Sequence, residues 1–465
     1  MKKKRMAKVL AVILIALQVF GGRRVFAGDY IRDDNGVIQV NEGNTYENTG
    51  YYENSKDSIF GIAGGFHLVG LEQVDKRAHI HGNILTKHFI NDGDFGTKGV
   101  DEVNYLKRIT GGGDVMATVT PGSALVIGKT DMVVGTTDGG NAWTINGNKV
   151  NRPRKENNPN GWWQDNEKEF IDFAKVEQEA KDLVENLSNL ENNGTIIKNT
   201  DQNNQEIIID NQQFSVYNIK NGDFNFTNPI HIKGFDPDKL STLIINVDMN
   251  KMDNNAEFFI PESIGHYTNN TKISTGEVSV WSNASIIWNV YDSSKTDKIY
   301  TGTIENRGPV TASILSPGAT VSLHSNLNGT VIAKEIVVYA QSHRDDHTGP
   351  KPEGLDVETT AISVKKIWEG EALQSVTINL LADGKKVKSV VLSQENNWEH
   401  TFDGLDKLNS EGKDIIYTVE EVEIEGYETT ITGDATEGFT VTSTKDQEEP
   451  EEPEEPEEPE EPEEP

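Results

Sequence analysis

The pattern of apolar and polar residues is most regular between residues 304 and 338. Two short apolar runs, 313–315 and 330–333, are separated by turns rich in glycine, asparagine and proline. The runs align at one constant offset, which pairs Ile314 with Val331, Leu315 with Ile332 and Val321 with Val338. A repeated strand and turn of this kind is typical of the coils of a β-solenoid, in which each coil covers the apolar face of its neighbour. The pattern therefore predicts an all-β, stacked head.

The period changes between residues 165 and 192, where apolar residues recur every three or four positions. This predicts one helix, with Asp165 or Asn166 as its N-cap and the Asn192–Gly194 turn at its end. A single apolar stripe indicates that the helix docks along the flank of the β-stack. A free coiled coil is the alternative, but the segment spans only about four heptads.

Residues 359–445 alternate apolar and polar positions with a period of two, which predicts a second domain made of β-strands. Asp383 and Gly384 separate two of the predicted strands and form a good hairpin turn. About 85 residues of this kind fit a β-sandwich.

The two ends of the chain have different compositions. Residues 1–27 combine a basic start, a short apolar run and Ala27 before Gly28, which predicts a cleaved export signal rather than a retained anchor. Residues 28–343 form the predicted head, and 344–358, which begin with a proline-containing stretch without apolar residues, form the predicted linker. Residues 446–465, mostly Glu-Glu-Pro repeats, are expected to be a disordered spacer. No sorting motif or hydrophobic anchor follows the repeats, so the protein either continues into a wall anchor beyond residue 465, which we expect, or is released.

Charge and cysteine content exclude some classes of protein. The formal net charge is −32, so phosphate backbones would be repelled and a nucleic-acid partner is not expected. There is no cysteine, so a disulfide framework cannot stabilise the folded chain. No cofactor motif is present either.

The run ILSPGATVSLHSNLNGTVIAK, preceded by the strand Ser285-Ile-Ile-Trp-Asn-Val, resembles the C-terminal signature of the choice-of-anchor A domain of bacterial surface proteins. The resemblance covers roughly residues 58–343. It implies an adhesin-like, right-handed β-helix, distantly similar to ice-binding β-solenoids, in which a docked helix is also common.

The second domain resembles the Cna protein B-type repeat in its Val-Lys-Lys-Ile-Trp, Trp-Glu-His-Thr-Phe-Asp-Gly-Leu and Ile-Tyr-Thr-Val-Glu-Glu segments. The resemblance implies an immunoglobulin-like sandwich with an internal isopeptide bond, in which Lys366 attacks an asparagine while Glu421 assists. Here Ser443 occupies the asparagine position. Because serine offers no amide carbonyl, we expect Lys366 and Glu421 to remain an uncrosslinked pair.

Three other groups of side chains contain parts of a possible metal or ice-binding site. His79 and His81 share a strand face, with His88 nearby, but no cysteine or acidic pair completes a metal site, so none is predicted. The polar segment 248–257 lacks the central glycine of a calcium loop, which favours a solvated turn. An ice-binding face needs regular threonine rows, and only Thr118 and Thr120 suggest one.

These observations predict a secreted, wall-displayed adhesin of a Gram-positive bacterium that binds a host or extracellular-matrix protein or glycan without catalysis. Polysaccharide lyases also use β-helices, so a glycan-processing enzyme is one alternative, although the sequence has no repeated paired-acid motif. A purely structural surface component is the other. The sequence identifies neither the ligand nor the residues that bind it.

Overall fold

The computed structural model describes residues 31–53, 55–90, 94–111, 116–117, 123–130, 132–137, 142–150, 161–166, 168–193, 195–197, 205–209, 214–236, 238–273, 284–352, 359–407 and 413–446. It divides into two compact units, Met1–Leu355 and Asp356–Pro465. The predicted export signal, residues 353–358 of the predicted linker and residues 447–465 of the predicted spacer lie outside the described residues. Within the described ranges, no helix is both long enough and apolar enough to cross a membrane.

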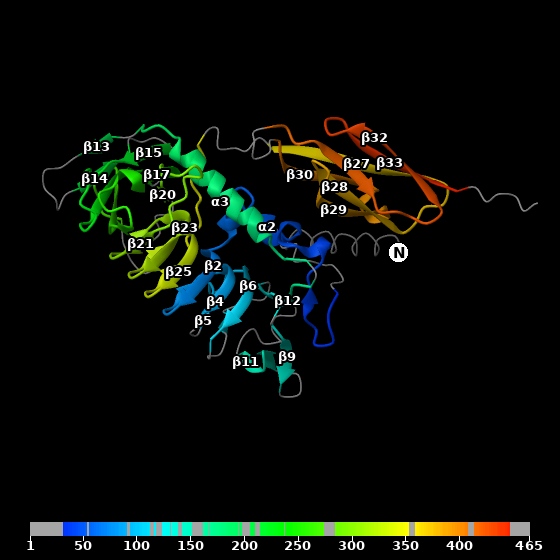
Figure 1. Cartoon of the computed structure of the whole chain (residues 1–465), viewed down its shortest axis with the longest axis horizontal. Helices are drawn as coiled ribbons and strands as arrows, with labels where there is room; N and C mark the ends of the chain where they lie inside the picture. Colours follow the sequence, from blue (N-terminus) through cyan, green and yellow to red (C-terminus); the bar gives the residue numbers. More distant parts are fainter. Residues whose placement is uncertain are drawn as a thin grey trace, which may run out of the picture. The chain divides into compact units, whose positions relative to one another are not determined.

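The first unit is built on one sheet of 13 strands, joined by parallel pairings (Figure 1). Eleven of them form a continuous path: β1 (Ile38–Gln39), β12 (Trp162–Gln164), β8 (Ala124–Ile127), β6 (Val103–Thr110), β4 (Ile84–Ile90), β2 (Leu68–Lys76), β25 (Val331–Val338), β23 (Ser313–Leu323), β20 (Ala284–Tyr291), β17 (Ser241–Asp248) and β15 (Phe214–Ile219). Two more, β21 (Thr303–Asn306) and β18 (Glu257–Ile260), continue from the second half of β23. The expectation of successive paired strands is therefore confirmed to the extent that they form a large parallel sheet.

The predicted register between β23 and β25 is correct at its start and wrong at its end. Ile314 pairs with Val331 and Leu315 with Ile332, as the constant offset predicts. The register then shifts between Ser316 and Thr320, so that Val321 lies opposite Ile336 and Leu323 opposite Val338. The strand with the longer insertion bulges, and a constant offset cannot account for a bulge.

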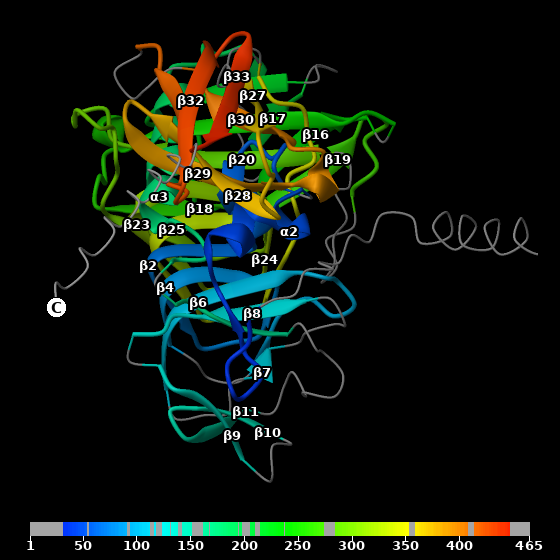
Figure 2. The same ribbon diagram turned by 90° about the vertical axis from the view of Figure 1, so that its right-hand side faces the viewer.

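The order of the strands is not their order in the sequence. β2 lies between β4 and β25, so the first long strand pairs with the last one. From β2 the chain builds outward through β4, β6 and β8 to β12, and the first four of these strands follow one another downward in Figure 2. It then resumes at the opposite edge with β15 and builds inward to β25. The two halves of the head therefore meet in the middle of the sheet.

Helix α3 (Phe173–Ser188) lies between these two halves in the sequence and packs against β17, β20, β23 and the 3-10 helix η3 (Gly61–Gly65). Its 16 residues span about 24 Å, or about five strand spacings. This length carries the chain from one side of the stack toward the other (Figure 1). The apolar stripe that predicted docking is buried: Phe173, Val176, Ala180, Leu183, Val184 and Leu187.

The start of the helix differs from the prediction. Asp172 is the N-cap, and its side chain accepts hydrogen bonds from the backbone N–H groups of Ala174 and Lys175. Asp165 instead accepts hydrogen bonds from the Tyr105 hydroxyl, at 2.5 Å, and the Phe170 N–H, at 3.0 Å. The expectation that Asp165 or Asn166 caps the helix is therefore wrong, because Asp165 has a tertiary partner.

Successive side chains of one strand enter two different cores. Ile314 and Trp288 belong to the core on one face of the main sheet, whereas Leu315 and Ile287 belong to the core beneath α3 on the other face. Because both faces are covered here, these strands are continuous apolar runs rather than alternating ones.

A ladder of three asparagines, two of them buried, joins the sheet to α3. Asn218, Asn246 and Asn289 occupy equivalent positions on β15, β17 and β20. Asn246 Nδ2 donates to Asn218 Oδ1, and Asn289 Nδ2 to Asn246 Oδ1, both at 2.8 Å. Asn246 also donates to the carbonyl of Leu187 at 2.7 Å, and Asn289 to that of Val184 at 3.3 Å. The ladder thus contacts carbonyl groups near the C-terminal end of the helix.

We expect Asn246→Ala to destabilise the head by about 2 kcal/mol, because it removes the central amide, so that Asn218 Oδ1 loses its donor and the buried Asn289 Nδ2 loses one of its acceptors. Asn250→Ala is the matched control, since Asn250 is exposed and donates a long hydrogen bond, 3.3 Å, to Ser293 Oγ. Calorimetry of the full chain measures both. Equal unfolding midpoints for the two variants would contradict a docking role for the ladder.

Smaller elements complete the first unit. A second parallel sheet contains the two-residue strands β22 (Val310–Thr311), β24 (Leu327–Asn328), β26 (Ser342–His343), β3 (Ile80–His81), β5 (Asp94–Phe95) and β7 (Met116–Ala117). Two further sheets contain β13 (Thr195–Ile197), β14 (Gln205–Ile208), β16 (Ile230–Phe235) and β19 (Ser263–Tyr267), and β9 (Val134–Thr137), β10 (Ala142–Ile145) and β11 (Asn148–Val150). The remaining short helices are η1 (Glu42–Asn44), η2 (Tyr46–Asn48), α2 (Gly50–Glu53) and η5 (Met249–Lys251).

The second unit consists of two sheets around one apolar core. One contains β30 (Glu399–Asp406), β27 (Thr359–Glu369), β33 (Gly438–Lys445) and β32 (Tyr427–Asp434); the other contains β29 (Lys385–Ser393), β28 (Ser375–Ala382) and β31 (Tyr417–Glu421). The helix η6 (Gln394–Asn396) follows β29. Asp383 and Gly384 have positive φ angles and join β28 to β29, which confirms the predicted hairpin.

Candidate functional site

The second unit holds a buried lysine side chain, Lys366, between its two sheets. Lys366 on β27, Glu421 on β31 and Ser443 on β33 come together although they are far apart in the sequence. Lys366 Nζ lies 2.7 Å from Glu421 Oε1 and donates to Ser443 Oγ, and Ser443 donates to Glu421 Oε2 at 2.5 Å. The side chains of Lys366 and Glu421 are 0% and 1% exposed. The structure thus brings together the three residues that the sequence singled out.

The surroundings of Lys366 favour the neutral form of its amine more than water does. Burial lowers the pKa of Lys366, while the hydrogen bond and charge of Glu421 oppose that shift. The ammonium also lies 4.2 Å from the centre of the Trp368 ring. An amine and a carboxyl group are in place, but the serine hydroxyl supplies no carbonyl carbon for the amine to attack.

In the first unit, residues 344–350 follow the surface of the head rather than leaving it. The Arg344 N–H donates to the His81 carbonyl at 2.9 Å, and the Thr348 and Gly349 N–H groups donate to Ser285 Oγ at 3.1 and 3.0 Å. The Thr242 hydroxyl donates to the Pro350 carbonyl at 2.7 Å. We call residues 344–350 the strap. The first half of the predicted linker is therefore bound to the head.

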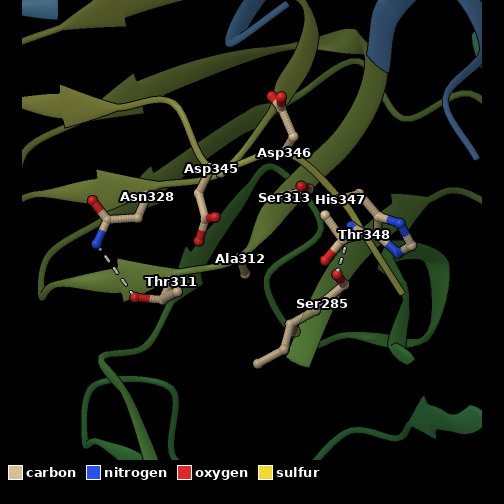
Figure 3. Close-up of a pocket in the computed structure, with 11 residues that line it drawn as sticks. Ser285, Thr311, Ala312, Ser313, Asn328, Asp345, Asp346, His347 and Thr348 are labelled. Atoms are coloured by element: carbon tan, nitrogen blue, oxygen red, sulfur yellow. Dashed lines mark hydrogen bonds between the residues drawn. The ribbon is translucent and has the colours of Figure 1, made fainter. Parts of the chain in front are cut away.

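A small polar cavity of about 20 Å³ lies between the strap and the head. Figure 3 shows the Asp345 carboxylate turned toward Thr311, beside Asn328. The walls include Ser285, Thr311, Ser313, Asn328, Asp345 and His347. Burial, together with the neighbouring charge of Asp346, raises the pKa of Asp345 to about 6, and burial lowers the pKa of His347 to about 4.

The predicted histidine group is only partly brought together. The rings of His79 and His81 are stacked 6.1 Å apart, and His81 stacks on His343 at 4.7 Å. His88 lies on β4, where its Nε2 is 2.7 Å from Thr110 Oγ1. No three histidines or acidic residues are placed to hold a metal ion in the part of the chain that the structure describes.

Two other sequence candidates have different outcomes. Asp248 is buried rather than solvated: it forms an ion pair with Lys251 at 2.6 Å and accepts a hydrogen bond from the Ser293 N–H at 3.0 Å, so its carboxylate joins η5 to the segment that follows β20. Thr118 and Thr120 lie outside the described residues.

Sequence reasoning missed a row of aromatic and basic residues on the surface. Arg307, His324, Tyr339 and Arg77 each come directly after a main-sheet strand, next to the paired residues Asn306, Leu323, Val338 and Lys76. We call these four residues the surface column. Each of these residues directly follows an apolar strand in the sequence. This pattern could have predicted the row, but only with knowledge that β2 pairs with β25.

Contacts with one another hold three members of the surface column in place, and the fourth, Arg307, forms an ion pair with Glu305 at 3.3 Å. The His324 and Tyr339 rings stack at 4.5 Å, and the Arg77 guanidinium lies 4.8 Å from the Tyr339 ring centre. Arg77 forms an ion pair with Asp75 at 2.6 Å. Tyr339 is 44% exposed, so the column presents ordered aromatic and basic groups to solvent.

Two protein families match the chain. Residues 59–344 match the family described as an ice-binding-like adhesive domain, and residues 362–444 match the Cna protein B-type domain. The predicted Cna B-type resemblance is thus confirmed. For the first unit, the match agrees with an adhesive domain, while the choice-of-anchor A resemblance stays a prediction.

Relatives are similar over a small part of the chain. A collagen adhesin of Staphylococcus aureus is 35% identical over 140 residues, which cover 26% of this chain and 12% of that protein. The crystal structure of two B repeat units of the S. aureus collagen-binding protein is 37% identical, covers 19% of this chain and 24% of that one, and has a TM-score of 0.17. The crystal structure of a single B repeat unit of the same protein is 26% identical. It covers 26% of this chain and 58% of that one, with a TM-score of 0.18. These TM-scores are too low to support a conclusion about the fold.

Proposed function

Because the chain belongs to the family of ice-binding-like adhesive domains, we propose that the protein is a cell-surface adhesin of a Gram-positive bacterium. The first unit is the binding head, and the Cna B-type unit is its stalk. The match over residues 59–344 carries this proposal, since it spans α3 and every strand of the large parallel sheet except β1. Secretion and attachment to the cell wall are parts of the same proposal.

The proposed architecture of the head is a right-handed β-helix. Parallel strands recur in both the main sheet and the sheet of two-residue strands, and the same chain segments contribute to each. A stacked β-helix suits adhesion because it presents side chains in rows at the strand spacing of about 4.8 Å.

The proposed contact surface is the surface column, and the proposed ligand is a host or extracellular-matrix protein or glycan. Its members are preordered by stacking and ion pairs, so binding would immobilise few side chains. Tyrosine and arginine, with tryptophan, are enriched among the few residues that carry most of the binding energy at protein interfaces. The relative's name, a collagen adhesin, makes collagen one ligand to include.

The proposed activity is binding without catalysis, and a screen of the full chain tests it. The chain is applied to a glycan array and to a panel of matrix proteins that includes type I collagen. We expect specific retention on at least one ligand, with the mass of that ligand unchanged. Cleavage of the ligand would instead indicate a glycan-processing enzyme, and retention on none would indicate a structural surface component.

A further inference from the structure

The strap contains an acidic residue whose charge is not balanced. Arg344 forms ion pairs with buried Glu102, at 3.2 Å, and with Asp346, at 2.7 Å. Its guanidinium contacts both oxygens of Asp346, so Arg344 is shared between two carboxylates. Asp345, its neighbour in sequence, has no base within ion-pair distance among the residues that the structure describes. A half-buried carboxylate without a counter-charge is unfavourable in a protein that is already acidic.

The cavity beside Asp345 provides two more oxygen atoms. Asn328 is 7% exposed, and its Oδ1 has no hydrogen-bond partner within the described ranges. Its Nδ2 lies 3.5 Å from Thr311 Oγ1, which is the outer limit of a hydrogen bond. Rotating the amide by half a turn exchanges the two atoms with little change in shape. The carbonyl oxygen then faces Thr311 on the cavity wall.

The size of the cavity suits an ion or one water molecule rather than a sugar. Its volume of about 20 Å³ exceeds the 10–15 Å³ that one water-sized particle requires. Figure 3 shows Asp345, Thr311 and Asn328 around the same hollow. Carboxylate, hydroxyl and amide oxygens are hard donors, and Ca²⁺ accepts such a set in irregular geometry, with water completing its shell. Mg²⁺ demands a regular octahedron and releases water reluctantly.

We propose that this cavity is a calcium site, with Asp345, Thr311 and Asn328 as its protein ligands. Asp345 belongs to the strap, whereas Thr311 and Asn328 belong to β22 and β24. A bound ion therefore clamps the strap to the head. With one carboxylate ligand the affinity is low, in the range of about 10⁻⁴–10⁻³ M found for extracellular calcium modules.

Calorimetry of the full chain, first treated with a chelator, tests the proposal. We expect about 5 mM CaCl₂ to raise the unfolding midpoint of the head by about 2–4 °C, and MgCl₂ to raise it far less. Asp345→Asn removes the calcium-dependent rise. Without metal this variant is at least as stable as the native chain, because an unbalanced charge has been removed.

Two further variants make the test specific. Asp346→Asn is the matched control, since it also removes one negative charge but leaves the three proposed ligands in place, so the calcium response persists. Asn328→Asp adds a charged ligand and should tighten calcium binding about tenfold in isothermal titration. No calcium response in the native chain, an equal response to Mg²⁺, or an unchanged response in Asp345→Asn would overturn the proposal.

Discussion

Replacing Ser443 with asparagine should let the second unit crosslink itself. Lys366 Nζ already contacts the side chain at position 443, and Glu421 is placed to polarise an amide there. The neutral amine attacks the side-chain carbonyl carbon of the introduced asparagine, a new C–N bond forms, and the former amide nitrogen leaves as ammonia. The intact mass of the full chain should fall by about 17 Da, the mass of one ammonia.

The bond should also raise the stability of the second unit. It closes a loop of 77 residues, which restricts the unfolded chain and adds roughly 4 kcal/mol by analogy with a disulfide. For a domain of this size, the unfolding midpoint rises by roughly 15 °C or more.

Two variants control the crosslinking experiment. Thr442→Asn places the same amide on the preceding residue of β33, whose side chain points away from the core, and should leave the mass unchanged. Glu421→Ala combined with Ser443→Asn should abolish the mass loss. A deficit of about 17 Da already present in the native chain would show that Lys366 has another partner.

The head should lose stability in acid because of His67. Its ring is fully buried, and Nδ1 lies 2.6 Å from the Gly329 carbonyl, which fits a neutral ring that donates. Burial, reinforced by His343, Arg344 and His81, lowers the pKa of His67 to about 3 in the folded state. The ordinary value of 6.5 applies to the unfolded chain.

The sign of the effect follows from proton binding. Below pH 6.5 the unfolded chain takes up a proton that folded His67 refuses, so stability falls as pH decreases toward 3. Between pH 7 and pH 4 this residue alone removes about 3 kcal/mol. Asp165 opposes part of the loss, because burial raises its pKa to about 6.

His67→Asn isolates this contribution, since an asparagine amide can donate to Gly329 but does not titrate. Calorimetry from pH 8 to pH 4 should show a shallower loss of head stability in the variant than in the native chain. From pH 8 to pH 7 the two dependences should agree, which serves as the internal control. Parallel curves down to pH 4 would mean that His67 is not the acid-sensitive group.

Local pairing could be predicted from the sequence, but the path of the chain could not. The offset between Ile314 and Val331 is visible because both strands are apolar on both faces. The pairing of β2 with β25 joins segments from opposite ends of the head's sequence, and no repeat marks it. This pairing depends on which edge of the sheet the chain reaches after α3, and tertiary packing determines that position.

The candidate sites show the same limit. Lys366, Glu421 and Ser443 were found because a family resemblance assigned them positions. The surface column could be recognised only once the register of neighbouring strands was known. The same holds for the proposed calcium ligands, because Thr311 and Asn328 are paired on adjacent short strands and Asp345 lies beside them on the strap. None of these residues forms a recognisable local motif.

Adhesion under flow tests the central claim that the head is an adhesive module. Beads coated with the full chain are passed over surfaces carrying type I collagen, other matrix proteins or immobilised glycans. The account predicts that native beads stay attached to at least one surface, and that beads carrying Arg77→Ala and Tyr339→Ala detach like uncoated beads. Beads carrying Val391→Ala, an exposed position on the second unit, should attach like native ones. Native beads that wash off every surface as fast as uncoated beads would contradict the account.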